Sequence, residues 1–454
     1  MNKSAIPQTP AGTGREVAGR DALRCDVLVV GGGPAGSTAA ALLAEKGWKV
    51  VLLEKDRHPR FHIGESLLPM NLPLFDALGV RGEIETIAMM KYGAELCSPH
   101  HSWQQTFFFS DALDKSQPYA YQVRRSEFDH ILLRNCARKG ATVIEECRVT
   151  DVDFPRSGGC VVSATGKDCG SQVWAARYLV DASGRDTLLA SKFGIKRRNV
   201  HHSSAALFGH YTGVERLPGR DEGNISIFWF EHGWFWQIPL QQGITSIGAV
   251  CSPRYLKTRK TSPESFLSET IALCPQLMSR MRDARLASPV TATGNYSYQA
   301  ERMAGDSYVM VGDAYAFIDP VFSSGVFFAM NSALLGAETV DGTLRDPARR
   351  KALEKQLDTT VRRGLSSFSW FIYRMTSPTI RNLLMAPRNY FRVQEALLSL
   401  LAGDVFRSRA VHVRLLFFKA IYYVGGAFSF RSSLSAWRQR RRAAREAYQD
   451  PAAG

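Results

Sequence analysis

The chain has 454 residues, of which 45% are hydrophobic and 22% charged, and its formal net charge is +15. This length is enough to bury a sizeable core, and it predicts two or three domains. No stretch is apolar over the roughly 18 residues that a membrane span needs, so no transmembrane segment is expected.

The N-terminal residues 1–22 are polar and lack the apolar core of a signal peptide, which predicts a disordered tail. The eight cysteines are scattered and form no C-x-x-C pair. Such a pattern is typical of reduced thiols, and it predicts a cytoplasmic protein.

The first ordered stretch, residues 25–55, reads CDVLVVGGGPAGSTAAALLAEKGWKVVLLEK. Its two apolar runs predict buried strands over 25–30 and 49–53, with a helix over 34–46 between them. The turn has the spacing G-x-G-x-x-G, and Glu54 follows its first glycine by 23 residues. This combination predicts a dinucleotide-binding unit of the Rossmann type.

Each part of this unit has a physical role. Gly31 permits the tight turn, Gly33 lets backbone approach a pyrophosphate, and Gly36 lets the helix pack close to the strand. The helix start presents N–H groups to the phosphates, while the Glu54 carboxylate can accept hydrogen bonds from ribose hydroxyls. The residues expected at the ligand are Gly31, Gly33, Pro34, Ala35, Gly36, Glu54 and Lys55.

A second helix is expected within residues 123–140, with Ser126 as its N-cap, Asp129 as a capping-box acid and Gly140 at its end. Arg125 stands just before it. Short β-rich pieces follow at 142–150, 159–163 and 171–180.

Two later motifs decide between NAD and FAD. The third β-rich piece runs into LVDASGRD (179–186), and a later strand ends at Gly312-Asp313, where the acid can hold a ribityl hydroxyl. Together with the first glycine motif, they resemble the flavoprotein monooxygenase superfamily over residues 24–340. The resemblance implies FAD and an α/β fold: an FAD-binding Rossmann-like domain of the GR2 type, with a β-sheet substrate domain and a helical C-terminal region.

Three further motifs narrow the family: GESLLP (64–69), HGWFWQIP (232–239) and FIDPVFSSG (317–325). In this order they resemble the flavin-dependent halogenases. The tryptophan pair has period 2, so an ordinary buried sheet face would explain it equally well. The resemblance implies flavin contacts from Glu65, Ser66, Arg125, Trp234, Trp236, Asp313, Pro320, Gly325 and Val326.

The last motif precedes an apolar helix predicted over 326–335. N–H groups at a helix start attract anions, so chloride or bromide could bind there, although an ordinary helix cap has the same sequence. The resemblance implies a halide at the backbone of Ser324 and Gly325.

Family halogenases are thought to form a flavin hydroperoxide, from which halide releases hypohalous acid; a lysine then holds or activates this oxidant beside the substrate. Lys91 in AMMKYGAEL (88–96) matches the lysine's position, 26 residues after Glu65. A strand lysine is usually only solubilising, but the flanking methionines indicate a mostly buried strand. Lys91 is therefore the predicted catalytic residue.

One departure bears on the substrate. Tryptophan halogenases carry a glutamate that assists the electrophilic step, and Phe322 stands in its place here. A phenol or pyrrole stabilises the developing positive charge with its own heteroatom, so we expect such a ring rather than tryptophan.

The predicted organisation is a core over 23–340, with a β-rich substrate part near 92–123 and 200–300, and a helical region over 341–454 that covers the substrate. Within the latter, residues 388–406 predict a helix that stops at Gly403. The basic run RQRRRAAR (438–445) suits a solvated helix, and the alternatives are an acidic protein, a membrane surface or nucleic acid. No nucleic-acid-binding or metal-binding signature accompanies it, so neither ligand is expected.

The sequence thus predicts an FADH2-dependent halogenase of an electron-rich aromatic. No second G-x-G-x-x-G follows a strand, so a separate flavin reductase would supply FADH2. The substrate is a small aromatic, which an acidic carrier protein could present to the basic enzyme. Two rivals stay open: a flavin hydroxylase, and a non-catalytic flavin protein that acts as a basic docking module.

Overall fold

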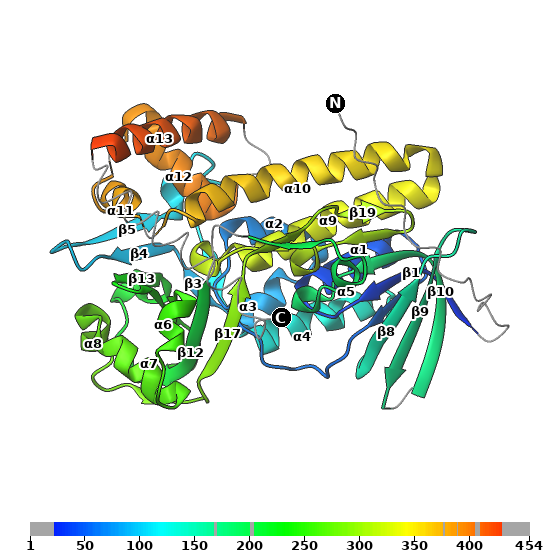
Figure 1. Ribbon diagram of the computed structural model, residues 1–454, viewed down its shortest axis with the longest axis horizontal. Helices are drawn as coiled ribbons and strands as arrows, with labels where there is room; N and C mark the ends of the chain where they lie inside the picture. Colours follow the sequence, from blue (N-terminus) through cyan, green and yellow to red (C-terminus); the bar gives the residue numbers. More distant parts are fainter. Residues whose placement is uncertain are drawn as a thin grey trace, which may run out of the picture.

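The computed structural model describes residues 22–167, 170–199, 204–375, 377–387, 389–404 and 409–428. The predicted tail up to residue 21 and the basic run at 438–445 lie outside these ranges. The molecule has a mixed α/β fold with two large sheets, which confirms the predicted fold class (Figure 1).

The first sheet has eight strands, and its main path runs β19-β20-β10-β1-β2-β7, with β9 and β8 continuing from β10. The strands are β1 (Leu23–Val30), β2 (Val50–Leu53), β7 (Thr142–Ile144), β8 (Cys147–Asp153), β9 (Cys160–Gly166), β10 (Gly170–Asp181), β19 (Ala304–Gly305) and β20 (Tyr308–Met310). All four residues of β2 and the last four of β1 are buried, as in a parallel sheet covered on both faces.

The register of this sheet explains the wide spacing of the sequence motifs. Val30 at the end of β1 lies beside Asp181 of β10, and Asp181 lies beside Met310 of β20. The three strands are parallel, so the turns that follow them meet at one edge of the sheet. Ligands of open α/β sheets bind at this carboxyl edge.

Helices cover the sheet, and α1 (Pro34–Glu45) packs between α4 (Arg125–Arg138) and α9 (Ser324–Arg345). The predicted cap of α4 was wrong. Its N-cap is Arg124, two residues before Ser126, so Ser126 and Asp129 do not form a capping box. Asp129 forms an ion pair with Arg125 instead. The shorter helices of the core are α2 (Leu72–Leu78), α3 (Arg81–Ile87) and α5 (Leu188–Lys192).

The second large sheet has the order β16-β12-β15-β14-β13-β4-β5, with β17 beside β12. Its strands are β4 (Gly93–Cys97), β5 (Gln104–Phe108), β12 (Ser204–Thr212), β13 (Ile225–Phe230), β14 (Gly233–Pro239), β15 (Thr245–Cys251), β16 (Arg285–Leu286) and β17 (Thr291–Tyr296). The associated helices are α6 (Pro253–Lys257), α7 (Pro263–Ala272) and α8 (Pro275–Arg280).

Two small sheets and several single turns connect these parts. The small sheets contain β3 (Met89–Lys91) with β6 (Ala120–Gln122), and β11 (Lys196–Arg198) with β18 (Tyr298–Ala300) and β21 (Ala316–Phe317). The single turns are η1 (Pro69–Asn71), η2 (Phe109–Asp111), η3 (Gly184–Asp186), η4 (Gly219–Gly223), η5 (Gly312–Ala314), η6 (Pro320–Phe322), η7 (Pro347–Arg349) and η8 (Tyr390–Arg392).

The C-terminal part is helical: α10 (Arg350–Ile372), α11 (Pro378–Met385), α12 (Val393–Ala402) and α13 (Arg409–Phe428). The last three stack above β4 and β5 at one end of the molecule (Figure 1). Gly403 ends α12 with φ of 96°, which confirms the predicted glycine stop.

Candidate functional site

A large cavity of about 360 Å³ opens at the carboxyl edge of the first sheet. Most of the predicted ligand residues line it, namely Gly31, Gly33, Pro34, Ala35, Glu54, Lys55, Glu65, Ser66, Arg125, Trp234, Trp236, Asp313, Gly325 and Val326. Segments that are hundreds of residues apart in sequence therefore share one cavity.

The glycine turn shows two different reasons for glycine. A Cβ at Gly33 would point into open space, with the Arg60 guanidinium as its nearest neighbour at 3.8 Å, so this position leaves room for a ligand. A Cβ at Gly36 would lie 1.8 Å from the Gly31 carbonyl oxygen. Gly36 therefore serves the close packing of α1 on the turn, and it does not line the large cavity.

The acid after β2 is held by backbone. Glu54 is buried, and its carboxylate accepts hydrogen bonds from the N–H groups of Gly32 and Asp56. These bonds fix the carboxylate beside the glycine turn and leave each oxygen a second lone pair for a ligand. Lys55 next to it is paired with Asp186.

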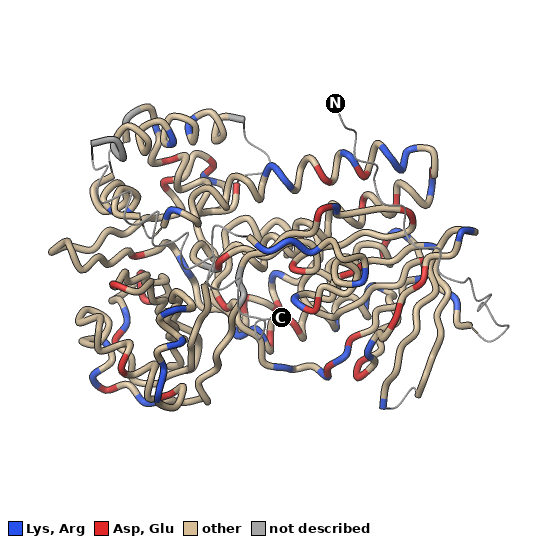
Figure 2. The backbone as a smooth tube through the Cα atoms, viewed as in Figure 1, with Lys and Arg blue, Asp and Glu red and all other residues tan. Residues whose placement is uncertain are grey.

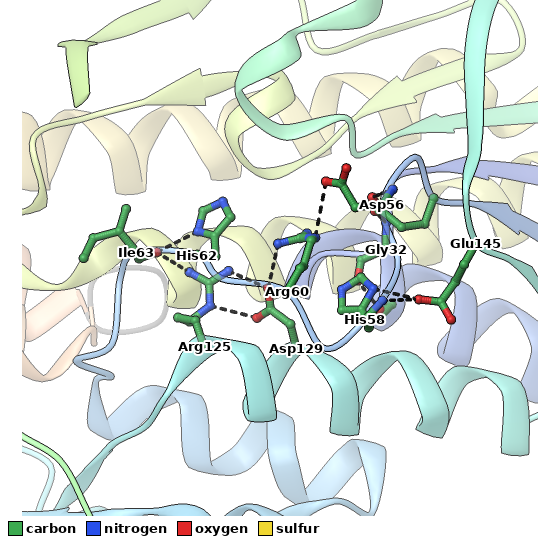
Figure 3. Close-up of polar contacts among 11 residues, drawn as sticks. Gly32, Asp56, His58, Arg60, His62, Ile63, Arg125, Asp129 and Glu145 are labelled. Carbon is green, nitrogen blue, oxygen red and sulfur yellow. Dashed lines mark hydrogen bonds and ion pairs between the residues drawn. The ribbon is translucent and has the colours of Figure 1, made fainter. Parts of the chain in front are cut away.

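Arg125 lines the large cavity and belongs to an ionic cluster with Asp129 and Arg60 (Figure 3). Its Nε and Nη2 atoms donate to the two carboxylate oxygens of Asp129 at 2.8 and 2.9 Å, and its Nη1 donates to the Ile63 carbonyl at 2.6 Å. Burial alone would raise the pKa of the Asp129 carboxyl, but the Arg125 guanidinium holds it below its usual range. Arg60 lies 3.6 Å from the same carboxylate.

A neutral histidine completes this cluster. Burial and the nearby Arg125 lower the pKa of His62 to about 4. Its Nδ1–H donates to the Ile63 carbonyl at 2.7 Å, the same acceptor that Arg125 uses. The cluster thus concentrates positive charge from Arg60 and Arg125 beside the glycine turn, where a pyrophosphate would need it.

Asp313 follows β20 and lines the cavity. Burial raises the pKa of its carboxyl to about 6, although Arg125 and Arg185 act to lower it. Asp181, at the end of β10, has a different role. Its carboxylate accepts from the N–H groups of Ser183 and Leu189, and thereby shapes the turn after the strand.

The start of α9 faces the same cavity. Ser323 has φ of 55° and precedes the helix, and Ser323, Gly325 and Val326 line the cavity wall. No neighbour lies within 4 Å of a Cβ built on Gly325, so the first turn of the helix leaves open space at this residue. The predicted halide residue Ser324 is buried beside Gly325, and Pro320 begins the turn η6 that precedes α9.

Glu65 and Ser66, from the segment 64–69, line the large cavity. Glu65 is buried, and its Oε1 lies 2.7 Å from the Nε2 atom of His210. Trp234 and Trp236 on β14 face the cavity together, with ring centroids 6.0 Å apart. The Trp236 indole N–H donates to Ser246 Oγ at 3.1 Å.

Lys91 occupies a second, smaller cavity, which we call the Lys91 pocket. This residue ends β3 and is 2% exposed. Its Nζ donates to Ser66 Oγ at 2.9 Å and to the Leu67 carbonyl at 3.1 Å. Burial lowers the pKa of Lys91 to about 7.

The remaining lining of the Lys91 pocket is almost wholly apolar. Helices α11 to α13 close it with five side chains, Ile380, Leu384, Leu397, Leu401 and Phe418. Other parts of the chain contribute Leu68, Ala94, Leu96, Phe107, Phe109, Ile225, Ile227, Val321, Phe322, Ser323, Phe371 and Met375.

The two cavities are neighbours. Ile225 and Ser323 line both, and Ser66 lines the large cavity while its hydroxyl holds the amine of Lys91.

The donors in the large cavity fit a dinucleotide of the FAD type. The glycine turn and the start of α1 suit a pyrophosphate, Glu54 suits ribose hydroxyls, and Asp313 is a second carboxyl acceptor in the cavity lining. For a flat ring in this cavity, the tryptophan pair provides an apolar surface, and the start of α9 provides a polar one.

The sequence interpretation missed several residues of the large cavity. Arg60, His62, Arg148 and Arg185 all line it. The run RHPRFHIGES (57–66) contained a signal, since four basic or imidazole side chains follow shortly after Glu54. Arg185 lies within the LVDASGRD motif (179–186), although it was not singled out there, and no local pattern marked Arg148.

Comparison with known proteins gives a consistent result. A family model described as tryptophan halogenase matches residues 26–115 and 109–379. The 1H-pyrrole-2-carbonyl-[peptidyl-carrier protein] chlorinase of Pseudomonas fluorescens is 29% identical over 414 residues, which are 86% of this chain and 91% of that protein. The flavin-dependent halogenase gsfI of Penicillium aethiopicum is 36% identical over 350 residues, and the match covers 71% of this chain and 65% of the fungal protein.

Among solved structures, the myxobacterial chondrochloren halogenase CndH superposes with a TM-score of 0.75 at 31% identity, covering 89% of this chain and 97% of that one. A flavoprotein/dehydrogenase from Cytophaga hutchinsonii superposes with a TM-score of 0.80 at 29% identity, covering 89% and 100%.

Proposed function

The chain belongs to the flavin-dependent halogenase family, and we propose that it uses FADH2, O2 and chloride or bromide to halogenate an electron-rich aromatic ring. The observation that carries this proposal is the position of Lys91. It is a buried amine in an apolar pocket, and it is hydrogen-bonded to Ser66, which lines the cavity that fits FAD.

Reduced FAD, when bound, supplies the two electrons with which O2 and halide become hypohalous acid. The chain's own contribution begins at the start of α9. Its free N–H groups and dipole favour an anion there, and Gly325 keeps the approach open. Ser324 and Gly325 would hold the halide through backbone, next to the tryptophan wall of the large cavity.

Lys91 then acts on the oxidant. A pKa of about 7 means that ammonium and neutral amine are both populated near neutral pH. The ammonium can donate a hydrogen bond to hypohalous acid and polarise its oxygen–halogen bond, while the neutral amine can take the halogen as a haloamine and release water. In either form, Ser66 and the Leu67 carbonyl orient the nitrogen.

The pocket lining favours a phenol or a pyrrole. Among its lining residues, Lys91 is the one charged side chain, and the position of the family's assisting glutamate is taken by the buried Phe322. No carboxylate of the pocket could stabilise positive charge on an indole. A ring that donates electrons from its own oxygen or nitrogen would not need one.

The direct experiment supplies FADH2 through a flavin reductase and offers a panel of phenols and pyrroles with bromide, chloride or neither. Mass spectrometry should show the halogen isotope pattern in the product only when halide is present. A hydroxylated product that forms equally well without halide would identify a hydroxylase. FAD binding without any turnover of the panel would favour a non-catalytic flavin protein.

The substrate could be carried by another protein. One relative in the family acts on a carrier-linked pyrrole, and this chain's net charge of +15 would attract an acidic carrier. Such attraction weakens with salt, so kcat/KM for a pyrrole on an acidic carrier should fall as ionic strength rises. Efficient turnover of a free ring at a rate that salt does not change would remove this part of the proposal.

A further inference from the structure

The outer face of α13 is apolar although it is exposed. Large side chains recur here at helical spacing: Val413, Leu416, Phe417, Ile421 and Val424. Leu416 is 62% exposed and Val424 is 60% exposed. An exposed apolar stripe of this regularity on a soluble protein usually marks a contact surface.

The inner face of the same helix is already used. Val411, Leu415 and Phe418 are buried, and Phe418 lines the Lys91 pocket. The two faces are thus separate stripes, one turned to the core and one turned outward. Core packing accounts for the first stripe and leaves the second unexplained.

Positive charge borders the outward stripe. At about 100° per residue, these five apolar side chains span an arc of about 140°, with Arg414 about 20° beyond one edge and Lys419 about 60° beyond the other. Both are half-buried, with the Lys419 amine 5.3 Å from the ring centre of Trp370. Helix α13 contains no Asp or Glu, and Figure 2 shows its cations along the outer edge of the molecule.

The surrounding region has the same sign. Between residues 359 and 428, the described part of the chain contains eight Lys and Arg against two Asp and Glu, a net charge of +6. Two copies of so basic a surface would repel each other, which argues against self-association through α13. The occupant should be negatively charged and should offer a broad apolar layer.

We propose that the outer face of α13 rests on an anionic lipid surface. An apolar arc with cations at both edges is the arrangement of a helix that lies in the membrane interface, where the cations reach the headgroups. No helix within the described residues is long and apolar enough to cross a bilayer, so this contact lies on the membrane rather than through it. The lid of the Lys91 pocket would then face the lipid, a source of apolar aromatic substrates.

The test is co-sedimentation of the full chain with lipid vesicles. One set contains phosphatidylcholine alone, and the other contains about one third phosphatidylserine. The chain should bind the anionic vesicles much more strongly, and salt should weaken this binding. Failure to bind anionic vesicles at low salt would overturn the proposal, as would binding to an acidic protein but to neither kind of vesicle.

Two double variants locate the contact. Leu416→Asp with Val424→Asp should reduce binding to anionic vesicles at least about tenfold, because two apolar anchors become charged. Leu273→Asp with Met278→Asp is the matched control. It changes the net charge equally, at side chains 51% and 49% exposed near α7 and α8, and should have little effect. Equal losses in both variants would assign the effect to charge alone and refute the α13 contact.

A charge variant tests the edges without touching the stripe. Arg414→Gln with Lys419→Gln should weaken binding to anionic vesicles about tenfold and leave binding to neutral ones unchanged. Circular dichroism and FAD binding should match the parent chain in every variant. Unchanged vesicle binding in a folded variant would contradict the role given to these cations.

Discussion

The large cavity and the Lys91 pocket differ in how their charged side chains are compensated. In the cavity wall, the carboxylate of Asp129 meets two guanidinium groups, and Glu54 accepts two backbone N–H groups. In the pocket, Lys91 has only a hydroxyl and a carbonyl as partners, and its pKa falls to about 7. Paired charges stay ionised and can hold a charged cofactor, whereas a desolvated amine becomes reactive at neutral pH.

The largest expected effect tests the pocket side of this contrast. Lys91→Met keeps the apolar stem and removes the amine. Formation of halogenated product should fall by about 10²- to 10⁴-fold, the usual contribution of a positioned acid–base group. FAD binding and oxidation of FADH2 by O2 should persist, since both occur in the large cavity.

Product and FADH2 oxidation are followed in one reaction, with Lys351→Met, an exposed lysine, as the control. Near-normal halogenation by the Lys91 variant would show that this residue has a structural role in its strand and no catalytic one. Loss of flavin binding would mean that the two cavities are not functionally separate.

The cavity side is tested at the glycine turn. In Gly33→Val the new side chain points into the cavity, so FAD affinity should fall about 10- to 100-fold, or ~1.4–2.8 kcal/mol, without loss of fold. In Gly36→Ala the methyl group meets the Gly31 carbonyl, so the free energy of unfolding should fall by about 1–3 kcal/mol. Fluorescence titration with FAD and chemical denaturation separate the two. The reverse pattern would show that the ligand site has been misplaced.

Burial of the amine also predicts a pH effect on stability. The folded-state pKa of Lys91 is about 7 against 10.5 in an exposed lysine, so the unfolded chain binds more protons between these values. Relative to Lys91→Met, the parent chain should therefore gain stability as pH rises from 7 to 10, by up to about 1.4 kcal/mol per unit. Urea denaturation of both proteins at several pH values measures this difference. A difference that stays constant with pH would mean that the lysine is solvated.

The smallest effect concerns the hydroxyl between the two cavities. The Ser66 hydroxyl is one of the two acceptors of the Lys91 amine, and it stabilises the ammonium form. Ser66→Ala removes this acceptor. The pKa of Lys91 should fall further, and the pH profile of kcat/KM should move to lower pH by about one unit. Ser66→Thr keeps a hydroxyl and should restore the parent profile. A profile that is identical in all three proteins would remove Ser66 from this role.

The outcome for α4 shows how local patterns can mislead. Ser126 and Asp129 have the spacing of a capping box, yet the helix starts earlier and Asp129 pairs with Arg125. A buried bidentate ion pair at i and i+4 outweighs a cap that contributes about 1 kcal/mol. Nothing in the local sequence indicated that this part of the helix would be buried against residues 60–63.

The sequence by itself determined the parts whose physics is local. The glycine spacing fixes a turn that only glycine can form, the apolar runs fix buried strands, and Gly403 fixes a helix end. Lys91 itself is buried as predicted, but its neighbour Met90 is exposed, and the role of Lys91 was taken from the resemblance to the flavin-dependent halogenases rather than from a local pattern.

Only the tertiary structure decided how these parts meet. Parallel pairing of β1, β10 and β20 brings three distant turns to one edge, and no local pattern encodes that register. The same holds for Arg60, whose guanidinium lies beside Gly33, and for the Ser66 hydroxyl that bonds to Lys91. Such contacts arise from long-range packing, since the free energy that fixes them is spread over the whole core.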